Sequence, residues 1–253
     1  MKEELVTSRR NSTVQHVRKL LSSKSYRLSC GAYAAEGTKL LDEALRWGAE
    51  VQLVLLQEEL ACPQLPQGVS CVRVPRDVMQ SVSQQQSPQG AAFVCKLPPQ
   101  RPARLLPGTL LLDGVQDPGN LGTMLRTADA LEIPVVLLDG CAEAYSPKTV
   151  RASMGAVFRT PPVCLRAEQA LALCREAGLR VWAAALEEGA ADLRACPVAD
   201  GAVIIGSEGQ GVRQALLDAC DGTVVIPMNP RCESLNAAVA AAIVMWQIRA
   251  GRA

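Results

Sequence analysis

Short apolar runs alternate with helical segments through the C-terminal half of the chain, and this alternation limits the possible folds more than any other feature. The apolar runs span residues 109–115, 135–139, 180–185, 202–206 and 223–227. Apolar strands that are separated by helices are typical of a parallel sheet with helices on both faces. We therefore predict an α/β fold whose sheet is mostly parallel.

The segments between these runs have helical spacing. The expected helices pass through Leu121, Leu125 and Ala128, begin at Ser146-Pro147 with Val150, Met154 and Val157 on one face, and span residues 167–177, 212–220 and 234–249. Ser146 is a good N-cap, Pro147 suits the first helical position, and Gly178 suits a C-cap.

A proline-rich stretch separates this half from a smaller N-terminal part. Residues 96–108 contain four prolines, which remove backbone donors and favour a semi-rigid linker. We place a domain boundary at about residue 104. Before it, we expect helices at residues 12–21 and 37–47 and strands at 51–56 and 69–74, so this part is a small α/β unit.

Composition excludes several classes of protein. The longest apolar run, Ala237–Trp246, is half of the ~20 residues that cross a bilayer, so no membrane span is predicted. The opening Met-Lys-Glu-Glu-Leu predicts no signal peptide. Ten cysteines are scattered singly, with no C-x-x-C pair and only one histidine, His16, so we expect reduced thiols and no metal site.

The 253-residue chain has a formal net charge of +1, but the charge is uneven. Residues 1–30 contain seven Lys and Arg against two Glu, a sum of +5. This basic arm indicates contact with a phosphate backbone, or else a solvated amphipathic helix. Only eight aromatic residues occur, which argues against an extended surface for stacking bases.

Three loops leave the carboxyl ends of predicted strands, where parallel sheets bind ligands. The first, D113-G-V-Q-D-P-G-N-L-G-T-M-L-R-T-A-D129, opens a helix with Asn120 and Arg126. These two residues are six apart, so they do not share a helix face. Either both line a cleft, or Asn120 caps the helix while Arg126 pairs with Asp129 or Asp113.

The second loop, I205-G-S-E-G-Q-G-V212, is neither a dinucleotide fingerprint nor a Walker loop. An NAD-type oxidoreductase and a nucleoside triphosphatase therefore have no support. Three glycines let the backbone approach a ligand closely, and Glu208 among them suits a cationic or hydroxyl-bearing ligand. A plain strand-to-helix turn explains the glycines equally well.

The third loop, I226-P-M-N-P-R-C-E-S-L-N-A237, ends at the start of the last helix. Ser234 is a sufficient N-cap for that helix. Asn236 lies where free N–H groups gather, and its carboxamide is a candidate for orienting a substrate hydroxyl.

Together, N-L-G-T-M-L-R-T-A-D-A, I-G-S-E-G-Q-G-V and I-P-M-N-P-R-C-E-S-L-N-A-A-V-A resemble the three motifs of the SpoU (TrmH-like) RNA ribose 2′-O-methyltransferases of the SPOUT superfamily. The resemblance covers about Leu110–Gln247. Upstream, R10-N-S…V17-R-K-L and A35-E-G-T-K-L are similar to the family's L30-like RNA-binding domain. The resemblance implies an L30-like substrate-binding domain at 1–104 and a SpoU/SPOUT catalytic domain at 105–253.

The resemblance also implies a trefoil knot in the catalytic domain, S-adenosylmethionine as cofactor, and a homodimer with its interface near the active site. By position, it implies a catalytic group of Asn120, Arg126, Glu208, Ser234 and Asn236, and a cofactor site of Gly206, Ile226, Pro227, Met228 and Leu235. Pro230 departs from the family pattern, which commonly has glycine in this region. Proline fixes φ near −65°, so it constrains the cofactor loop.

The implied reaction is attack of a ribose 2′-oxygen on the sulfonium methyl. Arg126 is expected to stabilise the developing negative charge, because a guanidinium with a pKa above about 12 is a poor base. The identity of the base stays open. Ser234, Asn236 and Glu208 are expected to orient the nucleophile and the loop.

The expected substrate is RNA, since only RNA has the 2′-hydroxyl. Ribosomal RNA is the first choice and transfer RNA the second, with Arg9, Arg10, Arg18 and Lys19 as RNA-binding residues in a cytoplasmic protein. The alternative from a different class is an RNA-binding module that keeps the fold and has lost transfer.

Overall fold

The computed structural model describes residues 4–85, 87–100, 104–229 and 231–252. Its contacts divide the chain into two compact units. Unit 1 comprises residues 1–99 and 145–159, and unit 2 comprises residues 100–144 and 160–253. The predicted boundary at about 104 lies beside residues 101–103, which are outside the described ranges. Because the segment 145–159 belongs to unit 1, a single cut in the sequence does not separate the units.

Unit 1 is built on a mixed five-stranded sheet with the strand order β1-β4-β3-β5-β2. Its strands are β1 (Glu4–Leu5), β2 (Ala32–Glu36), β3 (Val51–Gln57), β4 (Ser70–Val74) and β5 (Ala91–Lys96). Its helices are α1 (Ser12–Ser22), α2 (Lys24–Cys30), α3 (Thr38–Arg46), α4 (Arg76–Val82), α6 (Pro147–Ala152) and α7 (Ala156–Arg159). Strand β3 is parallel to β4 and antiparallel to β5.

Apolar residues of α1 and α4 pack on one face of this sheet and form one core cluster with β2, β3, β4 and β5. The segment 145–159 is held in unit 1 by aromatic contacts. Tyr145 lies against Tyr33 with ring centroids 4.7 Å apart, and Phe158 lies 6.3 Å from Phe93. Arg159 also forms an ion pair with Glu43 of α3.

Residues 147–159 form two short helices, α6 and α7, so the prediction of one continuous helix there was wrong. The break is at Met154 and Gly155, which both have left-handed backbones, with φ of +50° and +86°. Met154 is half exposed and does not belong to the predicted apolar face. A Cβ at position 155 would meet the Glu43 side chain at 3.1 Å, so the chain turns where only glycine fits closely.

Unit 2 contains a seven-stranded sheet in which every strand pairing is parallel, as predicted. Its order is β10-β12-β9-β11-β6-β7-β8. The strands are β6 (Thr109–Leu112), β7 (Val135–Leu137), β8 (Val163–Cys164), β9 (Val181–Ala184), β10 (Ala191–Asp192), β11 (Ala202–Ile205) and β12 (Gly222–Val225). The mixed α/β class predicted from the alternation is therefore confirmed.

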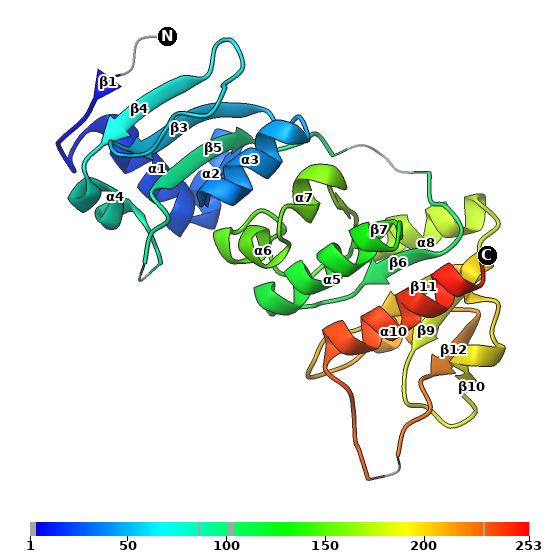
Figure 1. Cartoon of the computed structure of the whole chain (residues 1–253). Coiled ribbons are helices and arrows are strands. Elements are labelled where there is room, and N and C mark those ends of the chain that lie inside the picture. The colour runs from blue at the N-terminus through cyan, green and yellow to red at the C-terminus, as the bar shows by residue number, and fades with distance from the viewer. Residues whose placement is uncertain (1–3, 86, 101–103, 230, 253) are drawn as a thin grey trace. The chain divides into compact units, whose positions relative to one another are not determined.

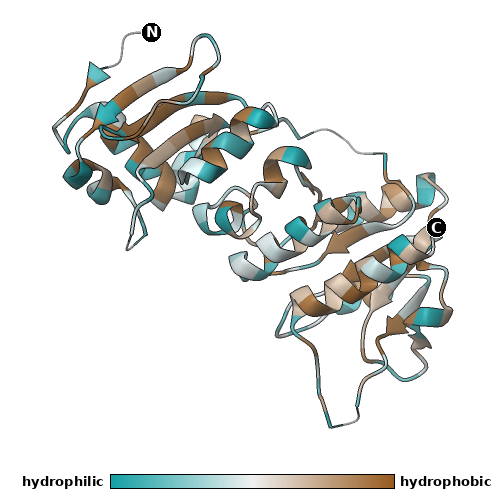
Figure 2. Ribbon diagram, viewed as in Figure 1, coloured by the Kyte–Doolittle hydropathy of each residue, from teal (hydrophilic) through white to brown (hydrophobic). Residues whose placement is uncertain are grey.

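The helices of unit 2 are α5 (Pro118–Ala130), α8 (Ala167–Glu176), α9 (Gln214–Leu217) and α10 (Ala237–Ala250), with 3₁₀ turns at Leu193–Ala195 and Val198–Asp200. Helices α8 and α9 share a core cluster with alternate residues of the strands. Helices α5 and α10 pack against each other, and α10 also contacts β11 (Figure 1). Figure 2 shows hydrophobic residues along the strands and along α10.

Two predicted helix boundaries in unit 2 were wrong. The helix expected at 212–220 is reduced to the single turn α9, and the last helix begins at Ala237 instead of Ser234. Strands β2 and β5 and helices α2 and α4 were not predicted, because tertiary pairing rather than local periodicity defines such short elements. No helix in the described ranges is both long and apolar enough to cross a bilayer.

Candidate active site

The first loop runs from the end of β6 into α5. Asp117 is the N-cap of α5, and its Oδ1 accepts a hydrogen bond from the Asn120 backbone N–H at 2.8 Å. Pro118 occupies the first turn, where its missing N–H has no cost. Because Asp117 caps the helix, the alternative that Asn120 serves as the cap is wrong.

The Asn120 side chain joins two residues that are distant in sequence. Its Nδ2 donates to Glu208 Oε1 at 2.8 Å, and its Oδ1 accepts from Asn236 Nδ2 at 3.2 Å. We call Asn120, Glu208 and Asn236 the polar cluster. Each of its members comes from a different one of the three loops. Glu208 and Asn236 are exposed and Asn120 is partly exposed, so a ligand can reach the cluster.

Asn236 is anchored at the same time by the start of α10. Its Oδ1 accepts from the backbone N–H groups of Ala238 and Val239 at 2.9 and 3.3 Å. Asn236 is therefore the N-cap, and the prediction that Ser234 has this role was wrong. The anchored oxygen directs the Nδ2 group of the same amide toward Asn120.

The glycine loop, residues 206–211, is folded back on itself. Ser207 and Gly211 form an isolated antiparallel bridge with two N–H···O bonds of 3.0 Å. A Cβ on Gly206 would lie 2.0 Å from the Gly211 backbone, so only glycine fits there. Glu208 is therefore presented at the tip of a tight turn next to Asn120.

A pocket of about 460 Å³ opens beside this loop. That volume is in the range of small-molecule sites. It is lined by residues 184–187 at the carboxyl end of β9, by residues 205–212, and by parts of β12 and the third loop. Of the predicted site residues, the lining includes Gly206, Glu208, Ile226, Met228, Ser234 and Leu235. Pro227 is the one predicted cofactor residue that the described lining does not include.

Residues 184–187 were not predicted as part of the site. They lie at the end of an ordinary apolar strand, and residues 184–187 contain no glycine or motif that indicates a ligand. Their contribution includes the apolar Leu186 and the carboxylate of Glu187, both exposed at the pocket rim. Only the neighbouring position of β9 and β11 in the sheet brings them to the glycine loop.

Arg126 does not join the polar cluster within one chain. It is exposed on α5, outside the pocket lining, and in the described residues no hydrogen bond links it to the other predicted catalytic side chains. The six residues from Asn120 correspond to about 240° around a helix, so the two side chains leave in different directions. The proposed pairing of Arg126 with Asp113 was wrong, since Asp113 is bound to Arg213.

Two further polar groups lie at the carboxyl end of β6. The Asp113 carboxylate accepts hydrogen bonds from Arg213 and raises the pKa of that guanidinium further above its ordinary value. Burial raises the pKa of the Cys141 thiol to about 11, and its Sγ donates to the Leu112 carbonyl at 3.1 Å. Cys141 is therefore protonated at neutral pH and is not a nucleophile.

The four predicted RNA-binding residues are all exposed in unit 1. Arg9 forms an ion pair with Asp77 at 2.9 Å, and Lys19 lies 5.6 Å from the centre of the Tyr26 ring. Arg10 and Arg18 also lie at the surface, Arg10 just before α1 and Arg18 on it.

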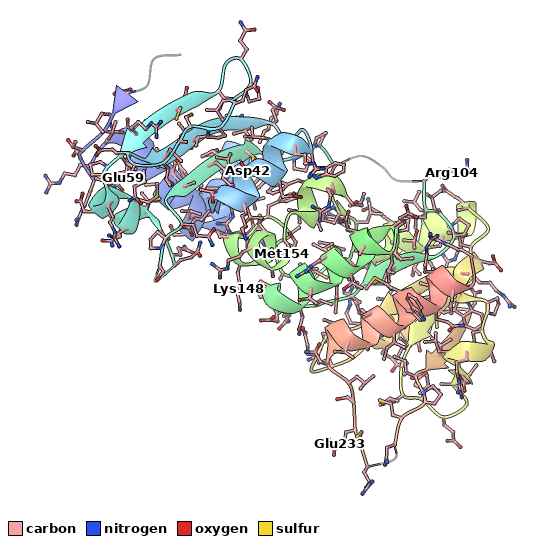
Figure 3. All side chains as sticks on the ribbon, viewed as in Figure 1. Asp42, Glu59, Arg104, Lys148, Met154 and Glu233 are labelled. Carbon is pink, nitrogen blue, oxygen red and sulfur yellow. The ribbon has the colours of Figure 1, made fainter. Side chains whose placement is uncertain are left out.

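The third loop extends from β12 to α10, and Figure 3 shows Glu233 near its far end. Pro230, which departs from the family pattern, lies outside the described residues. The neighbouring Met228 and Leu235 line the pocket from either side of that position.

Comparison with known families and proteins gives two domain matches. Residues 107–246 match the SpoU rRNA Methylase family, and residues 11–92 match the MRM3-like substrate binding domain. A curated relative from Bacillus subtilis, 23S rRNA (guanosine(2553)-2′-O)-methyltransferase RlmP, is 36% identical over 246 residues, which cover 96% of this chain and 98% of that protein.

Solved structures agree with these matches. An AdoMet-bound rRNA methyltransferase from Sinorhizobium meliloti has a TM-score of 0.87 at 30% identity, covering 98% of this chain and 97% of that one. A putative RNA methyltransferase of the TrmH family from Porphyromonas gingivalis has a TM-score of 0.83 at 33% identity, covering 96% of this chain and 99% of that one.

Proposed function

Because the chain belongs to the SpoU rRNA methylase family, we propose that it transfers a methyl group from S-adenosylmethionine to a ribose 2′-hydroxyl of RNA. One observation supports this proposal above the others. Asn120, Glu208 and Asn236 come from three separate loops and form a hydrogen-bonded cluster beside a pocket of cofactor size.

The pocket suits S-adenosylmethionine chemically. The glycine loop provides close backbone approach, because a Cβ on Gly206 would fill the space against Gly211. Leu186, Ile226 and Leu235 offer apolar contacts for an adenine ring, while the carboxylates of Glu187 and Glu208 suit a cationic ligand. When bound, the cofactor supplies an activated methyl group on its sulfonium. Such a methyl needs no Lewis acid, so the proposal includes no metal.

The protein's part in the reaction is alignment and charge stabilisation. Asn120, itself held by Asn236, fixes the Glu208 carboxylate, which is then placed to accept a hydrogen bond from the ribose hydroxyl. Ser234 on the pocket lining provides a hydroxyl for orienting the nucleophile. Arg126 stabilises the developing negative oxygen, and because a guanidinium stays charged we do not assign it as the base.

A homodimer would bring Arg126 into the site. Arg126 is exposed and turned away from the cluster of its own chain, so we propose that it serves the site of the partner subunit. The α10 stripe, formed by Val239, Ile243 and Trp246 at helical spacing, supports a dimer because these side chains are 49, 37 and 65% exposed. The trefoil knot expected for this fold belongs to the same proposal.

The proposed substrate is ribosomal RNA, as in the name of the Bacillus relative. Residues 1–104 are proposed to hold it, with Arg9, Arg10, Arg18 and Lys19 contacting phosphates; Arg9 would have to leave Asp77 to do so. The proposed compartment is the cytoplasm, which is supported by the ten cysteines, none of them in a disulfide, because reducing conditions preserve thiols.

The test compares the wild-type protein with Arg126→Ala. We expect calorimetric titration to show S-adenosylmethionine binding to both, mapping of 2′-O-methyl sites to find a position in ribosomal RNA that only wild type modifies, and turnover of the variant to fall at least 100-fold. Full activity of Arg126→Ala would refute its role. Methylation of transfer RNA instead would show that the proposed substrate is wrong. If the wild-type protein gave no binding heat with S-adenosylmethionine, the protein would be an RNA-binding module without transfer activity.

A further inference from the structure

Asp113 is a buried carboxylate directly after β6, with a side chain only 1% exposed. Its backbone N–H donates to the Ile205 carbonyl at 2.8 Å, which extends the pairing of β6 with β11. Its carboxylate accepts from the Arg213 backbone N–H at 3.0 Å and from Arg213 Nε at 2.7 Å, and a terminal guanidinium nitrogen lies at 2.6 Å. Both guanidinium nitrogens contact Oδ1, and Oδ2 accepts the backbone N–H, so both carboxylate oxygens are occupied by Arg213.

These contacts tie both ends of the glycine loop to one residue. Ile205 precedes Gly206, and Arg213 follows Val212, so Asp113 holds the chain where it enters the loop and where it leaves. Between these two points the Ser207–Gly211 bridge closes the loop, and Glu208 at its tip contacts Asn120. Two contacts, Asp113 with Arg213 and Asn120 with Glu208, therefore join the segment 113–120 to the segment 208–213 at both ends.

We propose that Asp113 and Arg213 are a positioning pair, which sets the glycine loop and thereby the place of Glu208 in the polar cluster. Neither residue lines the pocket, so the pair acts through the loop and not on the substrate. This inference rests on the proposed function. It adds two residues outside the polar cluster on which the reaction depends indirectly, through the position of Glu208.

The physical reason is the cost of an unpaired buried charge. Removing the Arg213 side chain leaves the Asp113 carboxylate with one backbone donor from that residue, so either the carboxylate takes up water or the loop shifts to hydrate it. Both outcomes loosen the leaving end of the loop. Hydrogen bonds to charged groups correspond to roughly 10- to 100-fold in an equilibrium constant, and we expect cofactor affinity to fall by that factor.

The experiment uses the full chain and the variants Arg213→Ala, Arg213→Lys, Asp113→Asn and the double variant Asp113→Asn with Arg213→Ala. Cofactor binding is measured by calorimetry, RNA binding by filter retention, and the amide exchange of residues 206–213 by mass spectrometry without ligand. Arg194→Ala is the matched control, because Arg194 also pairs with an aspartate of unit 2, Asp192, but at an exposed position.

For Arg213→Ala we expect weaker cofactor binding, faster exchange confined to residues 206–213, and unchanged RNA affinity. Added guanidinium ion is expected to restore part of the cofactor affinity, and Arg213→Lys to retain part of it. The double variant is expected to be no worse than Arg213→Ala, because the two side chains act as one unit. Arg194→Ala is expected to match wild type in all three measurements.

Unchanged exchange in the loop of Arg213→Ala would overturn the inference, as would strictly additive losses in the double variant. Faster exchange across the whole sheet would also overturn it, since the pair would then only stabilise the fold. Wild-type protein that binds no S-adenosylmethionine would instead refute the proposed function, and the exchange of the ligand-free loop would still decide whether the pair positions it.

Discussion

Asn236 performs two tasks with the two ends of one amide group. Its oxygen caps α10, and its nitrogen donates to Asn120. A carboxylate at this position keeps the cap and suits the positive end of the helix dipole. However, it has no donor for Asn120 Oδ1, and it adds a negative charge near Glu208.

This division separates stability from activity. We expect Asn236→Asp to unfold within about 0.5 kcal/mol of wild type but to lose most methyl transfer, because the cap survives and the cluster does not. Asn236→Ala is expected to lose both, with a stability cost of about 1 kcal/mol. Thermal unfolding and turnover of the two variants, measured side by side, check this. An active Asn236→Asp would show that the amide donor is dispensable.

At the scale of elements, the glycine loop has no room for a side chain at one of its glycines and has room for one at another. A Cβ on Gly206 would lie 2.0 Å from the Gly211 backbone, whereas a Cβ on Gly209 meets nothing within 4 Å. The two glycines are three residues apart in the same turn, so they form a natural matched pair.

We expect Gly206→Ala to force the loop open and to weaken S-adenosylmethionine binding at least 10-fold. Gly209→Ala is expected to bind the cofactor within about twofold of wild type, because the added methyl has room. Calorimetric titration of both variants checks this. Equal losses in the two would mean that the loop needs glycine for flexibility and not for close packing.

For the whole molecule, the α10 stripe is the feature with the widest consequence. Trp246 is the most exposed residue of the stripe. If the stripe forms the dimer interface, replacing Trp246 with a charged residue removes an aromatic anchor from it. We expect Trp246→Glu to weaken self-association at least 30-fold, as measured by sedimentation velocity, and to reduce turnover because Arg126 would lose the partner site. The control is Leu28→Glu, which adds the same charge at an exposed apolar residue of unit 1. A dimeric Trp246→Glu would exclude the stripe as the interface.

Unit 1 also depends on a segment from later in the chain. Tyr145 and Phe158 pack on Tyr33 and Phe93 within that unit. Deleting residues 1–104 would therefore expose Tyr145 and Phe158, which remain in the rest of the chain. Surface substitutions at Arg10 and Arg18 test RNA binding more cleanly than this deletion does.

The sequence by itself determined the parallel sheet of unit 2, through apolar runs that alternate with segments of helical spacing. For Asn120, Glu208 and Asn236 the local patterns left purely structural explanations open, and the resemblance of the three motifs to a known family singled these residues out. The structure brings these three side chains within hydrogen-bond distance, as convergence of the loops requires.

Tertiary structure alone decided which groups become partners. Asp113 binds Arg213, 100 positions away, although Arg126 is a basic residue much nearer in sequence. The helical spacing through Met154 does not produce one helix, because the segment 145–159 packs into unit 1 and turns there at Met154 and Gly155 with a left-handed backbone. Residues 184–187 became pocket lining only because β9 pairs with β11. Local spacing cannot encode such contacts, since their energy arises from neighbours that the chain acquires only when it folds.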